Sequence, residues 1–320
     1  MSRFLVVRAL TLTAGLLLAS IIIFASLRLL PGDVAQMIGG TTASPDRIAA
    51  LREQLGLDRP VIAQYLDWIG GVFTGDLGRS IVSGSPIAAE LAQKAQVTVP
   101  LTLYSLLIAL ALALPLGVLT AYRRDALASR ALAVIGAGAA AVPIVWAGLL
   151  GAIVLSSWLG WLPAQGFPRT GWADPLAAIR SLTLPALTIG LVVGAILFRF
   201  VRSATLNALG AEHVRTAMAQ GRTRLGALVG HGLPGVGLSI VSLLGLQVAE
   251  LLVGAVIVEQ LFNLPGLGRM LVSDVGNRDL IKVQSTLFVL TAVILILGAL
   301  IDVLHRLIDP RLRVETEDER

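Results

Sequence analysis

Cysteine is absent from the 320 residues, and lysine is nearly absent. The first absence excludes a disulfide framework, a thiolate nucleophile and a cysteine-ligated zinc site. The two lysines, Lys94 and Lys282, lie outside any GxxxxGKS/T pattern, so the chain has no P-loop and we do not expect it to hydrolyse ATP. The three histidines are scattered, and neither HExxH nor GxSxG occurs. The sequence therefore offers no candidate catalytic residue, metal site or cofactor motif.

Charged residues are also scarce, at 14% of the chain, whereas hydrophobic residues make up 56% and the mean hydropathy is +0.83. The apolar runs are about twenty residues long and do not alternate with polar residues, which indicates membrane-spanning helices. This pattern predicts an all-α polytopic membrane protein. Six spans are expected, at residues 9–27, 98–121, 131–157, 181–201, 236–260 and 283–304.

The net charge of +5 comes from arginines that gather next to the predicted spans. Anionic lipid and the positive-inside rule account for such a distribution, so we do not expect nucleic acid as a partner. The arginine-rich loop 122–130, the loop 202–235 and the tail 306–320 would then be cytoplasmic. Both termini are therefore predicted inside, and residues 31–97 outside.

Residues 31–97 contain the polar part of the chain and several helix boundaries. "SPDRIAALREQLG" predicts a helix that Ser44 caps and Gly56 terminates, and "RPVIAQYLDWIGG" predicts a second helix that ends at Gly70–Gly71. "SPIAAELAQKAQ" then leads into the next span. The predicted organisation is residues 1–30 for the N-terminus and first span, 31–97 for a helical subdomain, 98–305 for a five-helix core with the loop 202–235, and 306–320 for the tail.

The segment "AEHVRTAMAQGRTRLGALVGHGLP" at 211–234 is basic and broken by glycine, and it stands between two apolar runs. Small or apolar residues at 206, 210, 214, 217 and 221 form one helical face, and Gly221 interrupts the helix. The pattern fits either an amphipathic connector on the lipid headgroups or a protruding element whose small-residue face another protein grips. The pattern alone leaves both interpretations open.

Few ionisable residues lie within the predicted spans. Arg28 and Asp302 lie near span ends, where they can reach the interface, but Glu250 lies inside the fifth span. A stand-alone secondary carrier would need a larger buried charge network and an inverted repeat. A membrane-embedded enzyme would need a nucleophile with its base, or a metal cluster. "GLVVG" at 190–194 is a GxxxG match, for which we expect close helix packing within the chain.

Longer motifs give the chain a family resemblance. "EHVRTAMAQG" (212–221) resembles the EAA loop of binding-protein-dependent ABC importer permeases, and "GAVIVEQLFNLPGLGRMLVSDVGNRD" (254–279) resembles the signature of the oligopeptide/dipeptide/nickel family, B-subunit type. Further motifs match that family in the same order: "RLLPGD" (28–33), residues 51–80, "WLGWLPAQG" (158–166), "LTLPAL" (182–187) and "LIDPRLR" (307–313).

The resemblance implies a type I ABC importer permease with six transmembrane helices and a small helical extracytoplasmic insertion after the first span. Such a permease lies in the bacterial inner membrane and forms half of a translocation pathway for dipeptides or oligopeptides. Its implied partners are a homologous C-type permease, two ABC ATPase subunits and an extracytoplasmic solute-binding protein. ATP and magnesium would be bound by the ATPases, so this chain itself would be no enzyme. Nickel chelates, glutathione or haem remain alternative substrates within the family.

The EAA-type loop would be the coupling helix that seats in an ATPase. The resemblance assigns this interface to Glu212, Arg215, Thr216, Ala217, Met218, Ala219, Gln220, Gly221 and Arg222. Members of the family commonly carry a basic residue where Met218 and Gln220 stand, and a proline near Ser239, where this chain has Pro234 instead.

The fifth span carries the candidate substrate contacts. Glu250 replaces a small residue usual in the family, and we assign it with Gln247 to the substrate pathway. Glu250 would contact a substrate amine or a charged residue of the partner permease. The alternative is a buried carboxylate that is protonated or held by hydrogen bonds.

Overall fold

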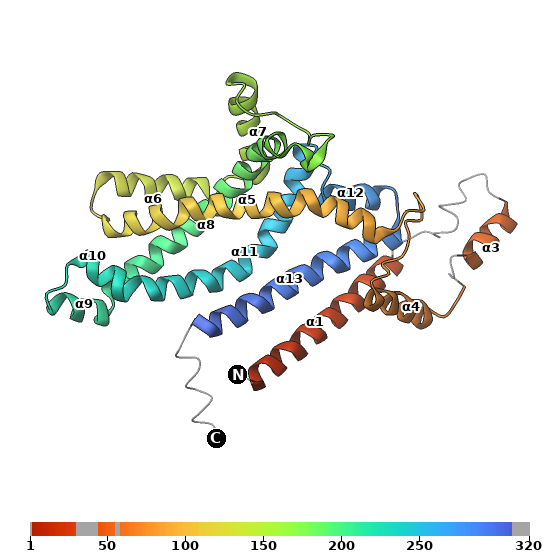
Figure 1. Ribbon diagram of the computed structural model, residues 1–320, viewed down its shortest axis with the longest axis horizontal. Coiled ribbons are helices and arrows are strands. Elements are labelled where there is room, and N and C mark those ends of the chain that lie inside the picture. The colour runs from red at the N-terminus through yellow and green to blue at the C-terminus, as the bar shows by residue number, and fades with distance from the viewer. Residues whose placement is uncertain (1, 30–43, 55–57, 309–320) are drawn as a thin grey trace. The chain divides into compact units, whose positions relative to one another are not determined.

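The computed structural model describes residues 2–29, 44–54 and 58–308, and these are built from helices (Figure 1). The α-helices are α1 (Ser2–Arg28), α3 (Pro45–Gln54), α4 (Val61–Thr74), α5 (Ile87–Tyr122), α6 (Leu127–Ala139), α7 (Ile144–Gly151), α8 (Pro175–Gly210), α9 (Glu212–Ala219), α10 (Arg224–Ala227), α11 (Leu233–Leu261), α12 (Leu267–Gly276) and α13 (Leu280–Ile308). Two π-helical segments, η1 (Ala152–Trp158) and η3 (Leu228–Gly232), and a 3-10 turn, η2 (Gly171–Ala173), complete the described elements.

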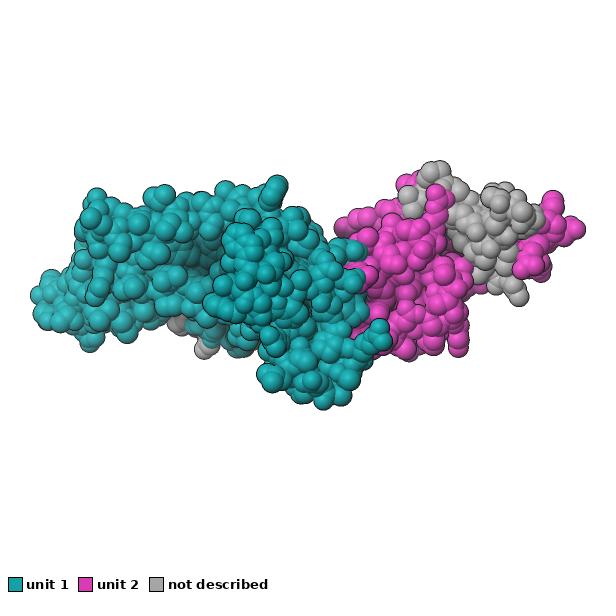
Figure 2. Space-filling view, turned by 90° about the horizontal axis from the view of Figure 1, so that it is seen from above, with its two compact units in different colours: residues 1, 97–268, 297–320 teal, residues 2–96, 269–296 magenta. Residues whose placement is uncertain are grey.

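The chain divides into two compact units, which Figure 2 shows in different colours. The first comprises residues 97–268 and 297–320 with residue 1, and the second comprises residues 2–96 and 269–296. The second unit therefore combines the region before residue 97 with a late segment of the chain. The predicted domain limits at 30, 97 and 305 remain a prediction.

Five described helices are long and apolar enough to cross a membrane, and a sixth span arises if one bent pair of helices counts as one. The predicted all-α polytopic fold is thus confirmed, with one correction. The third span, expected over 131–157, is broken between α6 and α7, and its two parts meet at 107°. Pro143 explains the break, because proline donates no backbone hydrogen bond and disfavours a helical conformation at Val142.

The core of the first unit forms where α8 meets α5, α7 and α11. Leu101, Leu182, Ile189 and Leu251 are among its fully buried side chains. The GxxxG glycines Gly190 and Gly194 face α5, and an added Cβ would lie 2.8 Å from Ile108 Cγ2 and 3.2 Å from Ala109 Cα, respectively. The predicted close packing within the chain is therefore confirmed.

The region before α5 follows part of its prediction. Ser44 caps α3, with its Oγ accepting a hydrogen bond from the Arg47 amide at 3.4 Å, whereas the predicted terminator Gly56 lies outside the described residues. The predicted end of α4 at Gly70–Gly71 is wrong, because the helix continues to Thr74 and ends at Gly75 in a left-handed conformation. The lack of a side chain at Gly71 instead lets the chain after α4 pass close to the helix. A Cβ at Gly71 would lie 2.8 Å from the Asp76 carbonyl oxygen.

Candidate functional site

The segment between α8 and α11 folds into a compact element, residues 211–232, which we call the α9–α10 element. Ala211 leaves the α8 helix in an extended conformation, and Gly221 breaks the chain again with φ +91°. The break at Gly221 was predicted and is confirmed. Glycine adopts this left-handed φ without a Cβ penalty, so α9 ends and the chain turns toward α10.

Backbone hydrogen bonds fix the turn after α9. The Gly221 amide donates to the Met218 carbonyl at 3.0 Å, and the Arg222 amide donates to the Ala217 carbonyl at 3.2 Å. Thr223 then caps α10, because its Oγ1 accepts a hydrogen bond from the Gly226 amide at 3.1 Å. The two short helices are thereby held at a defined angle by local bonds.

One face of α9 packs into the protein. Val214 and Ala217 are buried with Ala227 of α10, and Met218 covers the edge of this small cluster. Val214 and Ala217 belong to the helical face recognised in the sequence. In the structure these two side chains point inward, and their small size lets α9 lie close to α10. This part of the face is therefore not presented to a partner.

The other face of α9 and the turn after it are open to solvent. Of the nine residues assigned to the ATPase interface, Ala217 is 4% exposed and Met218 is half-buried. The other seven are exposed, namely Glu212, Arg215, Thr216, Ala219, Gln220, Gly221 and Arg222. This face carries charges of both signs on a rigid helix, which suits docking to a protein surface.

The α9–α10 element is tied to the ends of three long helices. A Cβ on Gly232 would lie 3.5 Å from both Ala208 of α8 and Val214 of α9, so η3 packs closely against both helices. The Arg224 guanidinium lies over the Tyr122 ring at the end of α5, 5.2 Å from its centroid. A displacement of α9 would therefore be passed to α5, α8 and α11.

The two predicted pathway residues lie on α11, with different surroundings. Gln247 is 3% exposed, and its Oε1 is buried without a hydrogen-bond partner in the described part of the chain. Glu250 is exposed and makes no ion pair or hydrogen bond with any described residue. Within the described part of the chain, Glu250 is therefore neither buried nor held by a hydrogen bond.

A buried carboxylate does occur nearby, at Glu259, which the sequence did not single out. Glu259 is fully buried, and its Oε1 accepts a hydrogen bond from Thr98 Oγ1 at 2.6 Å. The same Thr98 oxygen accepts from the Leu267 amide at 2.8 Å. Any side chain at Gly266 would collide with the Glu259 carboxylate. Residues 259–267 of the motif thus fold around this carboxylate, and the sequence signal was an acidic residue within an apolar motif.

A second group of buried charges, in the 2–96/269–296 unit, was also missed. Lys282 Nζ lies 2.5 Å from Glu90 Oε2 and 3.1 Å from Asp274 Oδ1, and its side chain is 8% exposed. Burial raises the pKa of the Asp274 carboxyl, and the neighbouring ammonium of Lys282 opposes that rise. The cluster ties the start of α5 to α12 and α13 within this unit.

The described residues contain no group of three or more His, Cys, Asp or Glu side chains that could hold a metal ion. The other features of this region are the exposed outer face of α9, contacts from the α9–α10 element to long helices, and the Glu250 carboxylate on α11, which has no partner among the described residues. This combination suits the transmission of motion and the passage of a solute.

Comparison with known proteins gives matches over most of the chain. Residues 113–314 match the model of the family described as binding-protein-dependent transport system inner membrane component. Residues 1–102 match the model of the N-terminal region of binding-protein-dependent transport system membrane components.

Individual relatives cover nearly the full chain. The chain is 34% identical over 301 residues to a putative peptide transport system permease protein of Brucella abortus, covering 94% of this chain and 95% of that protein. It is 32% identical over 313 residues to a probable peptide ABC transporter permease protein of Sinorhizobium fredii, covering 98% and 100%. It is 33% identical over 313 residues to the glutathione transport system permease protein GsiC of Escherichia coli K12, covering 98% and 99%.

Proposed function

This chain belongs to the family of binding-protein-dependent transport system inner membrane components, and we propose that it forms half of the peptide pathway of an ATP-driven importer. Its relatives are named permease proteins of peptide transport systems, and this makes a stand-alone carrier the weaker interpretation. The other half of the pathway would come from a homologous C-type permease. A solute-binding protein would deliver the peptide from outside.

The observation that carries the proposal is the construction of α9. Its inner face is buried against α10, its outer face is exposed, and its base is fixed to α8 and η3. Two ABC ATPases would bind ATP and magnesium, and one of them would hold the outer face of α9 in a groove. Closure of the ATPases would then move α9 as a rigid body, and the long helices would follow.

The membrane orientation follows from the same placement. If α9 meets a cytoplasmic ATPase, the end of α5 is cytoplasmic too, because Arg224 of the α9–α10 element lies over Tyr122. The arginine-rich loop after α5 then lies on the side that the positive-inside rule favours. We therefore place both termini in the cytoplasm, the region between α1 and α5 outside, and the protein in the bacterial inner membrane.

Two relatives with peptide-permease names support peptides as the substrate class, and the GsiC relative supports glutathione as a second candidate. Glutathione is itself a small peptide with free carboxylates and a free amine, so both candidates present the same chemical groups.

Uptake into proteoliposomes tests the proposal. The full complex, with both permeases, both ATPases and a loaded binding protein, should accumulate a labelled dipeptide or glutathione only when ATP is supplied on the ATPase side. Accumulation without ATP would contradict an ATP-driven importer, and accumulation of neither solute would contradict the substrate class.

A further inference from the structure

The surface of α8 between α6 and α11 forms a trough in which two cavities adjoin. One cavity, of about 580 Å³, is lined by Ala133 and Ala137 of α6, by Leu243 of α11 and by a run of α8 residues that includes Arg199 and Arg202. We call this the arginine cavity. Most of its lining residues belong to α8, and α6 and α11 contribute the others.

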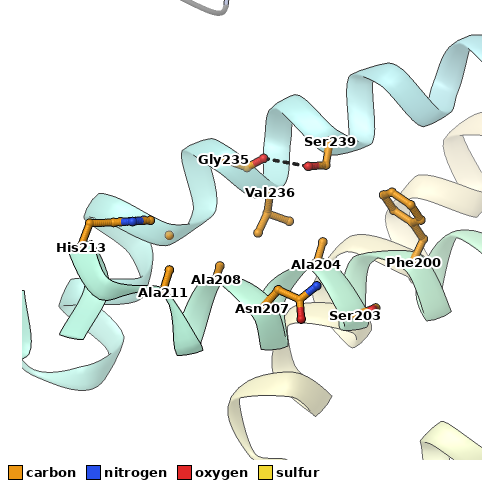
Figure 3. Close-up of a pocket in the computed structure, with 11 residues that line it drawn as sticks. Phe200, Ser203, Ala204, Asn207, Ala208, Ala211, His213, Gly235, Val236 and Ser239 are labelled. Carbon is orange, nitrogen blue, oxygen red and sulfur yellow. Dashed lines mark hydrogen bonds between the residues drawn. The ribbon is translucent and has the colours of Figure 1, made fainter. Parts of the chain in front are cut away.

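The second cavity, of about 430 Å³, continues the trough toward the α9–α10 element (Figure 3). Asn207 of α8, His213 of α9 and Ser239 of α11 lie along it. Figure 3 shows Asn207 on α8, His213 on α9, and Ser239 on α11 with its hydroxyl bonded back to the Gly235 carbonyl. Phe200 and Ser203 line both cavities. The trough therefore runs from the arginine cavity to the base of α9.

The arginine cavity is positively charged. Arg199 is exposed, Arg202 is half-buried, and neither forms an ion pair with a described residue. The Arg202 Nε is buried and has no hydrogen-bond partner in the described part of the chain. No carboxylate is among the residues that line this cavity. Two guanidinium groups without a counter-charge suit an anionic group, and the guanidinium fork matches a carboxylate.

The carboxylate of Glu250 lies further along the same side of α11. Ser239 and Leu243 line the two cavities, and Glu250 follows Leu243 by seven residues, so all three share one side of the helix. Seven residues of helix span about 10 Å, which matches the length of about three extended residues.

This side of α11 is expected to face the pathway instead of lipid. Glu250 lies well inside the helix, where it cannot reach a headgroup, and an ionisable residue at such a position faces a bundle interior or a water-filled cavity. Because Leu243 shares the side of Glu250, we expect the arginine cavity to face the same space. A lipid headgroup is thus the less favoured occupant of the two arginines.

We propose that the trough holds a short peptide in one direction, with its carboxylate at Arg199 and Arg202 and its amino group toward Glu250. This inference rests on the proposed function and adds to it the direction in which the peptide lies. The carboxylate end of the peptide lies nearer the base of α9, so it leads during import. Asn207, His213 and Ser239 line the route that follows.

The experiment compares a dipeptide bearing a free C-terminal carboxylate with its C-terminal amide in the reconstituted full complex. Loaded binding protein is kept saturating for both peptides, so that delivery is equal. The double variant Arg199→Gln/Arg202→Gln is set against Arg123→Gln/Arg124→Gln, which removes the same charge from the exposed loop after α5. Arg199→Lys/Arg202→Lys keeps the charge and serves as a rescue should the glutamine variant fold poorly.

The wild type and the loop variant should carry the free acid faster than the amide. Arg199→Gln/Arg202→Gln should slow the free acid about tenfold or more, since charge-assisted hydrogen bonds are lost, and leave the amide unchanged. The lysine variant should keep a preference for the free acid. Equal slowing of both peptides, or an unchanged preference, would overturn the proposal while peptide import stands.

Vesicle composition separates the peptide from a lipid headgroup. The comparison is repeated in phosphatidylcholine vesicles with and without phosphatidylglycerol. If the two arginines hold the peptide, the glutamine variant should lose the same amount of free-acid transport in both kinds of vesicle. An effect of the arginine variant that needs phosphatidylglycerol and is equal for both peptides would assign the arginines to lipid. A wild-type complex that carries neither peptide would refute the proposed function itself.

Discussion

The turn at Gly221 provides the sharpest test of how α9 is presented to a partner. At φ +91° an L-residue is strained, and no atom lies within 4 Å of a Cβ built there. Gly221→Ala therefore tests backbone strain without a steric clash, at a cost of about 1–2 kcal/mol. Gly221→Pro is more severe, because proline fixes φ near −65° and removes the amide that donates to Met218. We expect it to abolish the native turn.

The assay is co-purification of the two ATPases with the permease pair, together with the melting temperature of the permease pair alone. A strain of 1–2 kcal/mol in the docked conformation corresponds to a loss of affinity of about 5- to 30-fold for Gly221→Ala. Gly221→Pro should remove the ATPases completely. Because α9 is a short peripheral helix, the melting temperature should change little with either variant.

Gly210→Ala is the matched control. Gly210 ends α8 next to the same element, does not have a positive φ, and has no atom within 4 Å of an added Cβ. This variant should retain both ATPases. Recovery of both ATPases with Gly221→Pro at the wild-type level would refute the docking role of the turn. Ala217→Arg is a poorer test, since Ala217 is buried and an arginine there would disturb the packing of α9 as well as docking.

Three further outcomes follow from the buried and uncompensated charges. Glu250→Gln should reduce uptake of cationic peptides more than of neutral ones, and equal uptake of both classes at the wild-type rate would remove Glu250 from the pathway. Lys282→Met should lower the free energy of unfolding by about 3 kcal/mol or more, because the Glu90 and Asp274 carboxylates lose their cation. In the same denaturation assay, Lys94→Met should have a much smaller effect. Gly266→Ala should lower the melting temperature by displacing the Glu259 carboxylate, and a wild-type melting curve would contradict the close approach at this loop.

The long helices could be predicted because hydrophobic runs of this length have few alternatives in a membrane. The bend after α6 had a visible cause in Pro143, but Pro100, Pro115 and Pro185 lie inside continuous helices. A proline alone does not show whether neighbouring helices supply the support that keeps a span straight. That distinction depends on tertiary packing.

In the α9–α10 element, too, one part of the structure could be predicted from the sequence and another could not. The periodicity placed Val214 and Ala217 on one face, and Gly221 marked the break. Periodicity does not say whether such a face turns inward or outward, and the contact with Ala227 decided it. Glu259 was missed for a related reason, because it accepts its hydrogen bond from Thr98, which is far away in the sequence.

Because the chain has no cysteine, site-specific crosslinking can test whether the outer face of α9 docks on an ATPase. Gln220→Cys places a single thiol in this chain, on the exposed turn, and Ala126→Cys places one on the exposed loop after α5 as a control. Each variant is labelled with a maleimide–benzophenone reagent, assembled into the full complex and irradiated, and the adducts are identified by peptide mapping. Docking of this face predicts an ATPase adduct from position 220 and none from position 126. Labelled position 220 without any ATPase adduct would contradict it.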